Sequence, residues 1–231
     1  MGPEDIVIQL PEAPARQLFL LYHHSGDNPG SMLAAGERIA REFPQAGIIS
    51  ISSPHPLPTG GSEWFSEQEG SATLRQKAID SALPGFIAGV KQWQTQSGVS
   101  PAATALIGFS QGGTMVLEAL KIAPALAGRA VILSGRYNTP PLEGSVDTTI
   151  HLIHGEEDDV VPVQHAEEAE RWIVQSGGDV TLDRVGRLSH GIDESSLDLV
   201  VRHLKYTIPK RYFDEALSGG TPGQDDVVTL R

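Results

Sequence analysis

The sequence predicts an α/β protein whose sheet is mostly parallel and covered by helices on both faces. Apolar runs of strand length alternate along the chain with longer amphipathic stretches of helical spacing. This alternation is typical of parallel strands, because each parallel pair needs a long crossover connection, usually a helix. Some of the short runs, such as residues 18–22, are apolar throughout, as expected of strands buried on both faces.

The first predicted elements form one half of this sheet. Residues 6–10 are a short apolar run that suits an edge strand, and residues 18–22 form the first buried strand. Residues 31–43 predict a helix, because their apolar residues recur at helical spacing and Pro44 then ends the pattern. Residues 48–51 predict the next strand.

A long loop and a long helix follow. The loop at residues 54–70 contains several prolines and glycines and carries Trp64 and Phe65. A loop of this length inside a domain is uncommon unless it has a function. Residues 72–97 predict a helix, in which Pro84 predicts a kink or a break.

The rest of the chain alternates strand and helix regularly. The predicted strands are residues 104–109, 129–133, 148–153 and 180–185, and the predicted helices are residues 111–122, 163–175 and 195–206. We expect one domain over residues 1–208. We expect a tail over residues 209–231, in which residues 212–217 form a short helix and the remainder is flexible.

Composition narrows the class of partner. A length of 231 residues favours one domain at about 150 residues per domain. The 29 acidic and 17 basic residues give a net charge of −12, which argues against nucleic acid or an anionic membrane surface as the main partner. The absence of cysteine excludes disulfides and thiolate chemistry. Without a signal-peptide pattern or an apolar run of membrane length, we expect a cytoplasmic monomer or homodimer with no membrane insertion.

A candidate nucleophile follows the predicted strand at residues 104–109. Residues 108–112 read Gly-Phe-Ser-Gln-Gly, which fits the pattern G-x-S-x-G, and a predicted helix follows directly. In this setting the serine lies on a sharp turn above the carboxyl end of the sheet, next to a helix N-terminus that favours an oxyanion. We expect Ser110 to be a nucleophile, the alternative being a glycine-rich turn with an incidental serine.

A serine nucleophile needs a base, and the base needs a carboxylate that orients it. The acids at residues 156–159 follow a predicted strand, and Asp158 is the expected orienting acid because it lies in the turn before the apolar chain resumes. The alternative for this run is a solvated acidic turn. His190 follows the last predicted strand beside Gly191 and is the expected base, whereas His154 is expected to brace its loop.

The loop after residues 18–22 is expected to supply an oxyanion donor. The backbone N–H of Ser25, or alternatively that of His24, is expected to act together with the N–H of Gln111. The neighbours His23 and His24 also suit a metal site, but no acid stands beside them in a recognised ligand spacing. We expect neither a metal nor another cofactor.

Specificity residues are expected near the same edge of the sheet. Trp64 and Phe65 on the long loop, with Met32 at the start of the first helix, are candidates for an acyl pocket, the alternative being core packing. Arg136 and Tyr137 follow a strand at the expected rim, where they would meet a polar substrate group or each other. The negative net charge favours an uncharged ester or thioester.

Four motifs together carry a family resemblance: His23-x-x-Gly26-Asp27, Gly108-Phe109-Ser110-Gln111-Gly112-Gly113, His154-Gly155-x-x-Asp158-x-x-Val161-Pro162 and Ser189-His190-Gly191. On these motifs the chain resembles the phospholipase/carboxylesterase branch of the α/β-hydrolases, which includes acyl-protein thioesterases. The resemblance implies an α/β-hydrolase fold and places a catalytic triad on Ser110, Asp158 and His190. The chain differs from the family pattern at His24, where the family usually has glycine.

These features predict a serine carboxylesterase that acts on small to medium acyl esters through an acyl-enzyme. The alternative is an acyl thioesterase or lysophospholipase that acts on longer chains. A non-catalytic binding module with the same fold is a third hypothesis, against which the three filled triad positions argue. A dienelactone-type hydrolase commonly uses a cysteine nucleophile, which this chain lacks.

Overall fold

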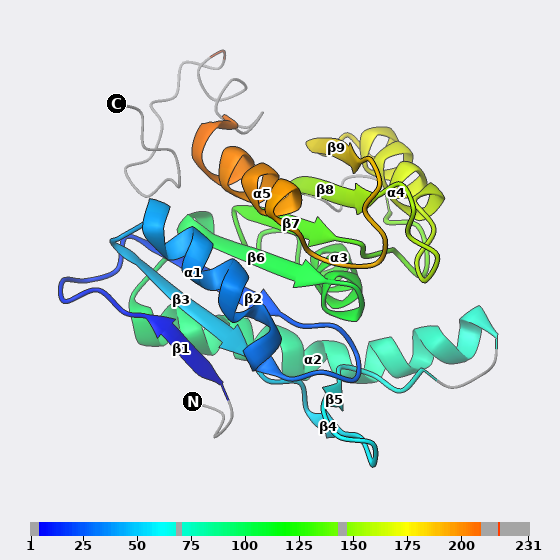
Figure 1. The fold of residues 1–231 in the computed structure, drawn as a ribbon, viewed down its shortest axis with the longest axis horizontal. Coiled ribbons are helices and arrows are strands. Elements are labelled where there is room, and N and C mark those ends of the chain that lie inside the picture. Colours follow the sequence, from blue (N-terminus) through cyan, green and yellow to red (C-terminus); the bar gives the residue numbers. More distant parts are fainter. Residues whose placement is uncertain (1–4, 68–70, 143–146, 209–216, 218–231) are drawn as a thin grey trace.

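The computed structural model describes residues 5–67, 71–142, 147–208 and 217. Within these residues, seven strands form one sheet in the order β1-β3-β2-β6-β7-β8-β9 (Figure 1). The strands of this sheet are β1 (Ile6–Gln9), β2 (Gln17–Tyr22), β3 (Ala46–Ile51), β6 (Thr104–Phe109), β7 (Arg129–Leu133), β8 (Thr149–Gly155) and β9 (Val180–Val185). Every neighbouring pair is parallel except β1 with β3. The predicted fold class is confirmed.

Helices cover both faces of the sheet (Figure 1). They are α1 (Leu33–Glu42), α2 (Ala72–Ser97), α3 (Gln111–Ile122), α4 (Gln164–Gln175) and α5 (Glu194–Tyr206). Helices α1 and α5 bury their apolar side chains in one core cluster, and α2, α3 and α4 bury theirs in another. Successive residues of β2 alternate between the two clusters, so Leu20 belongs to one and Leu21 to the other. The continuous apolar run is explained by burial on both faces.

Helix α2 does not break at its proline. Pro84 lies inside a single helix of 26 residues, so of the predicted kink or break, the break is wrong. A proline removes one backbone hydrogen bond, but Leu83 and Phe86 beside it are buried in the core, as is Val90 one turn further on. We infer that this burial holds the helix together across the missing bond.

The long loop before α2 contains a small hairpin that the sequence did not predict. Strands β4 (His55–Pro56) and β5 (Ser62–Glu63) pair with each other and enclose Gly60 and Gly61, which both have positive φ. A Cβ on Gly61 would lie 2.3 Å from the carbonyl oxygen of Gly26, so the hairpin packs directly on the loop after β2.

The predicted short helix at residues 212–217 and the flexible stretch after it lie outside the described residues, apart from Leu217. The predicted boundary at residue 208 therefore stays a prediction. Among the helices in the described part of the chain, none is both long and apolar enough to cross a membrane.

Candidate active site

The central strand β6 leads into a strained turn at Ser110. This residue lies between β6 and α3 with φ +54° and ψ −114°, a conformation that non-glycine residues rarely adopt. The glycines around it permit the close approach of other backbone segments. A Cβ on Gly112 would lie 2.4 Å from the carbonyl oxygen of Tyr22, and one on Gly108 would lie 2.6 Å from the carbonyl carbon of Gly112. The turn therefore presents the serine hydroxyl at the carboxyl edge of the sheet.

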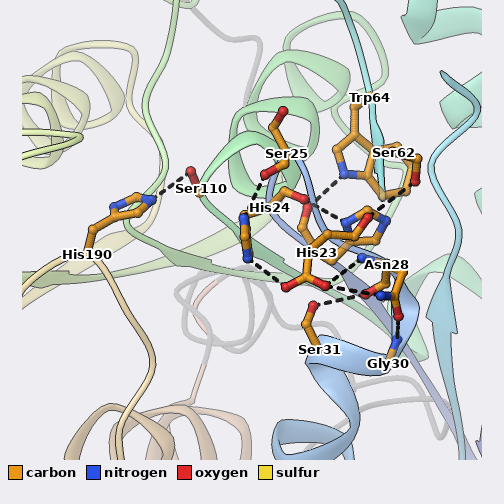
Figure 2. A network of polar contacts seen from close by, with 11 residues as sticks. His23, His24, Ser25, Asn28, Gly30, Ser31, Ser62, Trp64, Ser110 and His190 are labelled. Carbon is orange, nitrogen blue, oxygen red and sulfur yellow. Dashed lines mark hydrogen bonds and ion pairs between the residues drawn. The ribbon is translucent and has the colours of Figure 1, made fainter. Parts of the chain in front are cut away.

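Three predicted site residues from distant parts of the chain meet at this edge. His190 Nε2 lies 3.0 Å from Ser110 Oγ, a contact drawn in Figure 2. His190 Nδ1 lies 2.8 Å from Asp158 Oδ2 and 3.0 Å from Oδ1. Ser110, Asp158 and His190 follow β6, β8 and β9, respectively. Parallel strands place their carboxyl ends on one edge of the sheet, so the three residues meet there. The ring of Phe109 packs 5.1 Å from that of His190 and supports it.

The carboxylate of Asp158 is buried and held by several donors. Its Oδ1 accepts the backbone N–H groups of Val160 at 3.0 Å and Val161 at 2.8 Å. Burial alone would raise the pKa of Asp158, but hydrogen bonds from His190, Val161 and Ser134 outweigh it and hold the pKa below its ordinary value. The other acids of this run are exposed. Asp158 is thus the member of the run that is placed to orient His190.

His154 fixes the same loop as a neutral side chain. It is buried, and its Nε2–H donates to the carbonyl oxygen of Val161 at 2.6 Å. Burial lowers its pKa, although Asp158 Oδ2 lies only 3.4 Å away. The predicted bracing role is confirmed.

The loop after β2 lies beside Ser110 and carries Ser25 (Figure 2). Trp64 Nε1–H donates to the carbonyl oxygen of His23 at 2.8 Å. The ring of His24 contacts the carbonyl oxygen of Ser25 at 2.8 Å and the carboxylate of Asp27 at 2.9 Å. In the sequence no acid stands beside His24 in a recognised ligand spacing, and the pair with Asp27, three residues further on, forms within the loop itself.

Gln111 has a side-chain role that the sequence reading missed. Its Oε1 accepts the backbone N–H of Trp64 at 2.7 Å, and its Nε2 donates to the carbonyl oxygen of Phe65 at 2.9 Å. Its own backbone N–H opens α3 and so has no partner within the helix. The residue expected to supply an oxyanion donor therefore also anchors the long loop.

The chain is similar to proteins of one known family. A family model described as phospholipase/carboxylesterase matches residues 3–208. This chain belongs to that family. It is 49% identical to esterase YpfH of Escherichia coli K12 over 231 residues, which is all of both chains. It is 26% identical to acyl-protein thioesterase 1 of Kluyveromyces lactis over 178 residues, which covers 69% of this chain and 77% of the yeast protein.

A solved structure supports the same assignment. The crystal structure of esterase PE8 matches with a TM-score of 0.80 at 27% identity, and the match covers 87% of this chain and 97% of that chain. The predicted family and the α/β-hydrolase fold are both confirmed.

Of the three residues expected in an acyl pocket of this phospholipase/carboxylesterase family member, Met32 lies apart from Trp64 and Phe65. Trp64, Phe65 and Met32 are all buried, at 3%, 1% and 1% exposure. Trp64 lines a cavity of about 280 Å³ between α2 and the ends of β2 and β3, with Phe86 and Trp93 among the other lining residues. Met32 belongs to the core cluster on the opposite face of the sheet. The structure therefore does not place Met32 and Trp64 in one pocket.

The described residues contain no cluster of side chains that could bind a metal ion. Among the described residues, no three or more His, Asp or Glu side chains are placed to hold a metal ion. The neighbours His23 and His24 instead contact backbone carbonyl groups through their Nδ1 atoms, at 2.7 and 2.8 Å.

Proposed function

We propose that this protein is a serine carboxylesterase that hydrolyses small to medium acyl esters, with Ser110, His190 and Asp158 as its catalytic triad. The observation that carries the proposal is the unbroken series of contacts from Ser110 Oγ through both ring nitrogens of His190 to the Asp158 carboxylate. The strained turn under Ser110 and the family of the chain support it. The 49% identity to an esterase points to the same chemistry.

Acylation starts at the serine hydroxyl. Ser110 Oγ attacks the ester carbonyl carbon while His190 Nε2 takes the hydroxyl proton. Asp158 keeps the N–H of the imidazole on Nδ1 and stabilises the imidazolium that forms. The tetrahedral intermediate then collapses: the bond to the alcohol oxygen breaks, and His190 gives its proton to the departing alcohol.

The negative oxygen of the intermediate needs donors that are already in place. We assign this role to the backbone N–H of Gln111, at the start of α3, and that of Ser25, in the loop after β2. Deacylation repeats the sequence with water: His190 takes a proton from water, the hydroxide oxygen bonds to the acyl carbon, and Ser110 leaves with that proton. The chemistry requires no cofactor.

A second candidate is an acyl thioesterase or lysophospholipase with the same mechanism on longer chains. The likeness to acyl-protein thioesterase 1 favours keeping it. A chain-length series of nitrophenyl esters and acyl thioesters separates the two. Activity that peaks at short esters supports the carboxylesterase, and activity that peaks at long thioesters supports the alternative.

The test of the triad is the variant Ser110→Ala. Turnover of a nitrophenyl ester should fall by about a millionfold, as is typical when a triad nucleophile is removed. Labelling by a fluorophosphonate probe should be lost as well. A folded Ser110→Ala protein that keeps more than a few per cent of the activity would contradict the proposal. Absence of labelling in the folded parent protein would instead favour the binding module.

A further inference from the structure

An arginine that makes no ion pair with any described residue lies beside the first turn of α3, the helix that follows the candidate nucleophile. Arg136 follows β7, and its backbone N–H donates to Thr114 Oγ1 at 3.4 Å. Thr114 is in the first turn of α3, and its own N–H donates to the carbonyl oxygen of Ser110 at 2.9 Å. The backbone of Arg136 therefore lies at the carboxyl edge of the sheet, where an ester would bind.

The guanidinium of Arg136 is half-buried and almost without partners. Among the described residues its side chain makes one hydrogen bond, from Nη1 to His165 Nε2 at 3.4 Å, and its Nε is buried with no partner. No described carboxylate lies within ion-pair distance of it, although four other arginines at residues 38, 75, 184 and 202 each have such a carboxylate within 3.3 Å. Arg16, Arg41 and Arg187 also make no ion pair within the described part of the chain, but they are exposed to water.

A second cation lies near enough to act on Arg136. Arg75 is in the first turn of α2, packs over the ring of Phe65 at 5.3 Å and pairs with Glu67 at 3.1 Å. Burial first, and then the charge of Arg75, lower the pKa of Arg136, and the charge of Glu67 offsets only part of this lowering. An arginine nevertheless stays charged in proteins. Two partly desolvated like charges cost free energy that a bound anion would offset.

Another arginine shows what a structural role looks like in this fold. Arg129 is fully buried, and its guanidinium donates to the backbone carbonyl oxygen of His203 at 2.7 Å and to that of Thr207. It thereby supplies a donor to the carbonyl of Thr207, just after α5, and a second donor to that of His203, which also accepts the backbone N–H of Thr207 at 3.4 Å. Arg136 donates to no backbone carbonyl among the described residues, and its Nη2 makes no hydrogen bond with them.

We propose that Arg136 binds an anionic group, a carboxylate or a phosphate, on the ester substrate. The inference rests on the proposed esterase function and adds a substrate class to it. A guanidinium fork matches the oxygen geometry of both anions and forms charge-assisted hydrogen bonds with them. The expectation of an uncharged ester relied on the net charge of −12, which describes the whole surface and not the field beside Arg136.

The test compares charged and neutral substrates in the full-length protein. One arm uses mono-nitrophenyl adipate against nitrophenyl hexanoate, which puts the anion on the acyl side. The other arm uses hexanoyl glycerol phosphate against hexanoyl glycerol, which puts it on the alcohol side. In Arg136→Gln, the ratio of kcat/KM for the charged ester to that for the neutral ester should fall by about 10–100-fold in one arm. Arg136→Lys, which keeps the charge, should recover part of the ratio.

Arg16→Gln is the matched control, because it removes the same charge from an exposed position before β2, at the opposite edge of the sheet. It should leave both ratios within about twofold, since a distant exposed charge is screened by salt. Ratios that Arg136→Gln leaves unchanged in both arms would overturn the anion site. If the parent protein shows no Ser110-dependent hydrolysis of the neutral esters, the esterase function itself is refuted. The two failures are therefore distinguishable.

Discussion

The carbonyl oxygen of the Gln111 side chain lies 2.7 Å from the backbone nitrogen of Trp64, whose N–H it accepts. The amide nitrogen of the same side chain donates to the carbonyl oxygen of Phe65 at 2.9 Å. One residue thus connects the turn of the nucleophile with the loop that precedes α2, and its own N–H is a proposed oxyanion donor. Catalytic geometry and loop position are therefore physically linked.

Substituting Gln111→Ala should lower stability and activity together. The buried N–H of Trp64 and carbonyl of Phe65 would both lose their partner, at a cost of about 2–4 kcal/mol. The same loss frees the loop beside the oxyanion donors, so kcat/KM should fall by about 10–100-fold. Urea unfolding and ester kinetics measure the two effects.

Gln94→Ala is the control for this variant. The Gln94 side chain also makes two buried hydrogen bonds, donating to Thr104 Oγ1 at 3.2 Å and to the carbonyl of Leu126 at 2.8 Å, but it does so near the start of β6. It should lose similar stability and keep kcat/KM within about twofold. Equal kinetic losses in both variants would show that Gln111 acts through global stability alone.

The choice among the consecutive acids can be tested by single amide substitutions. Asp158→Asn would offer an N–H to His190 Nδ1 and favour the wrong tautomer of the base. The kcat should therefore fall by about 10⁴-fold with the fold intact, an effect known from other serine hydrolases with this triad. Asp159→Asn, at the exposed neighbouring position, should change kcat by less than about twofold. The opposite ranking of the two variants would move the orienting role to Asp159.

The sequence predicted those parts of the candidate site that depend on short local segments. The turn around Ser110 has a local motif, and Asp158 and His190 each follow a strand whose apolar pattern is clear, so parallel pairing brings the three together. The anchor from Gln111 to Trp64 and the hairpin packed on Gly26 depend on contacts between distant segments. No local pattern marks such contacts, and they could not be read from the chain.

Core packing explains two features that the sequence did not predict correctly. A proline such as Pro84 tends to break a helix because it removes a backbone hydrogen bond, yet burial on either side keeps α2 continuous. Met32 is apolar and close in sequence to the oxyanion loop, but it leads directly into α1 and packs in the core cluster on the opposite face of the sheet from Trp64. In both cases the tertiary environment outweighed a local tendency.

A buried histidine outside the active site makes stability depend on pH. His151 is fully buried in β8, with Nδ1 at 2.9 Å from Thr181 Oγ1 and Nε2 facing a guanidinium nitrogen of Arg129 at 3.5 Å. Its ring stacks on that of His203 at 4.3 Å. Burial first, and then the charges of His203 and Arg129, lower the pKa of His151 to about 2. The folded protein therefore keeps this imidazole neutral in mildly acidic solution.

The unfolded chain protonates the same side chain at its ordinary pKa of about 6.5. Above that pH neither state binds the proton and the contribution of His151 to stability is fully present. As the pH falls from about 6.5 towards 2, only the unfolded state gains the proton, so the free energy of unfolding should decrease by up to about 1.4 kcal/mol per pH unit from this group. Urea unfolding of His151→Gln between pH 7 and pH 5 should show a shallower decrease than the parent protein. The exposed His55→Gln should keep the parent slope, and a parent-like slope in His151→Gln would refute the assignment.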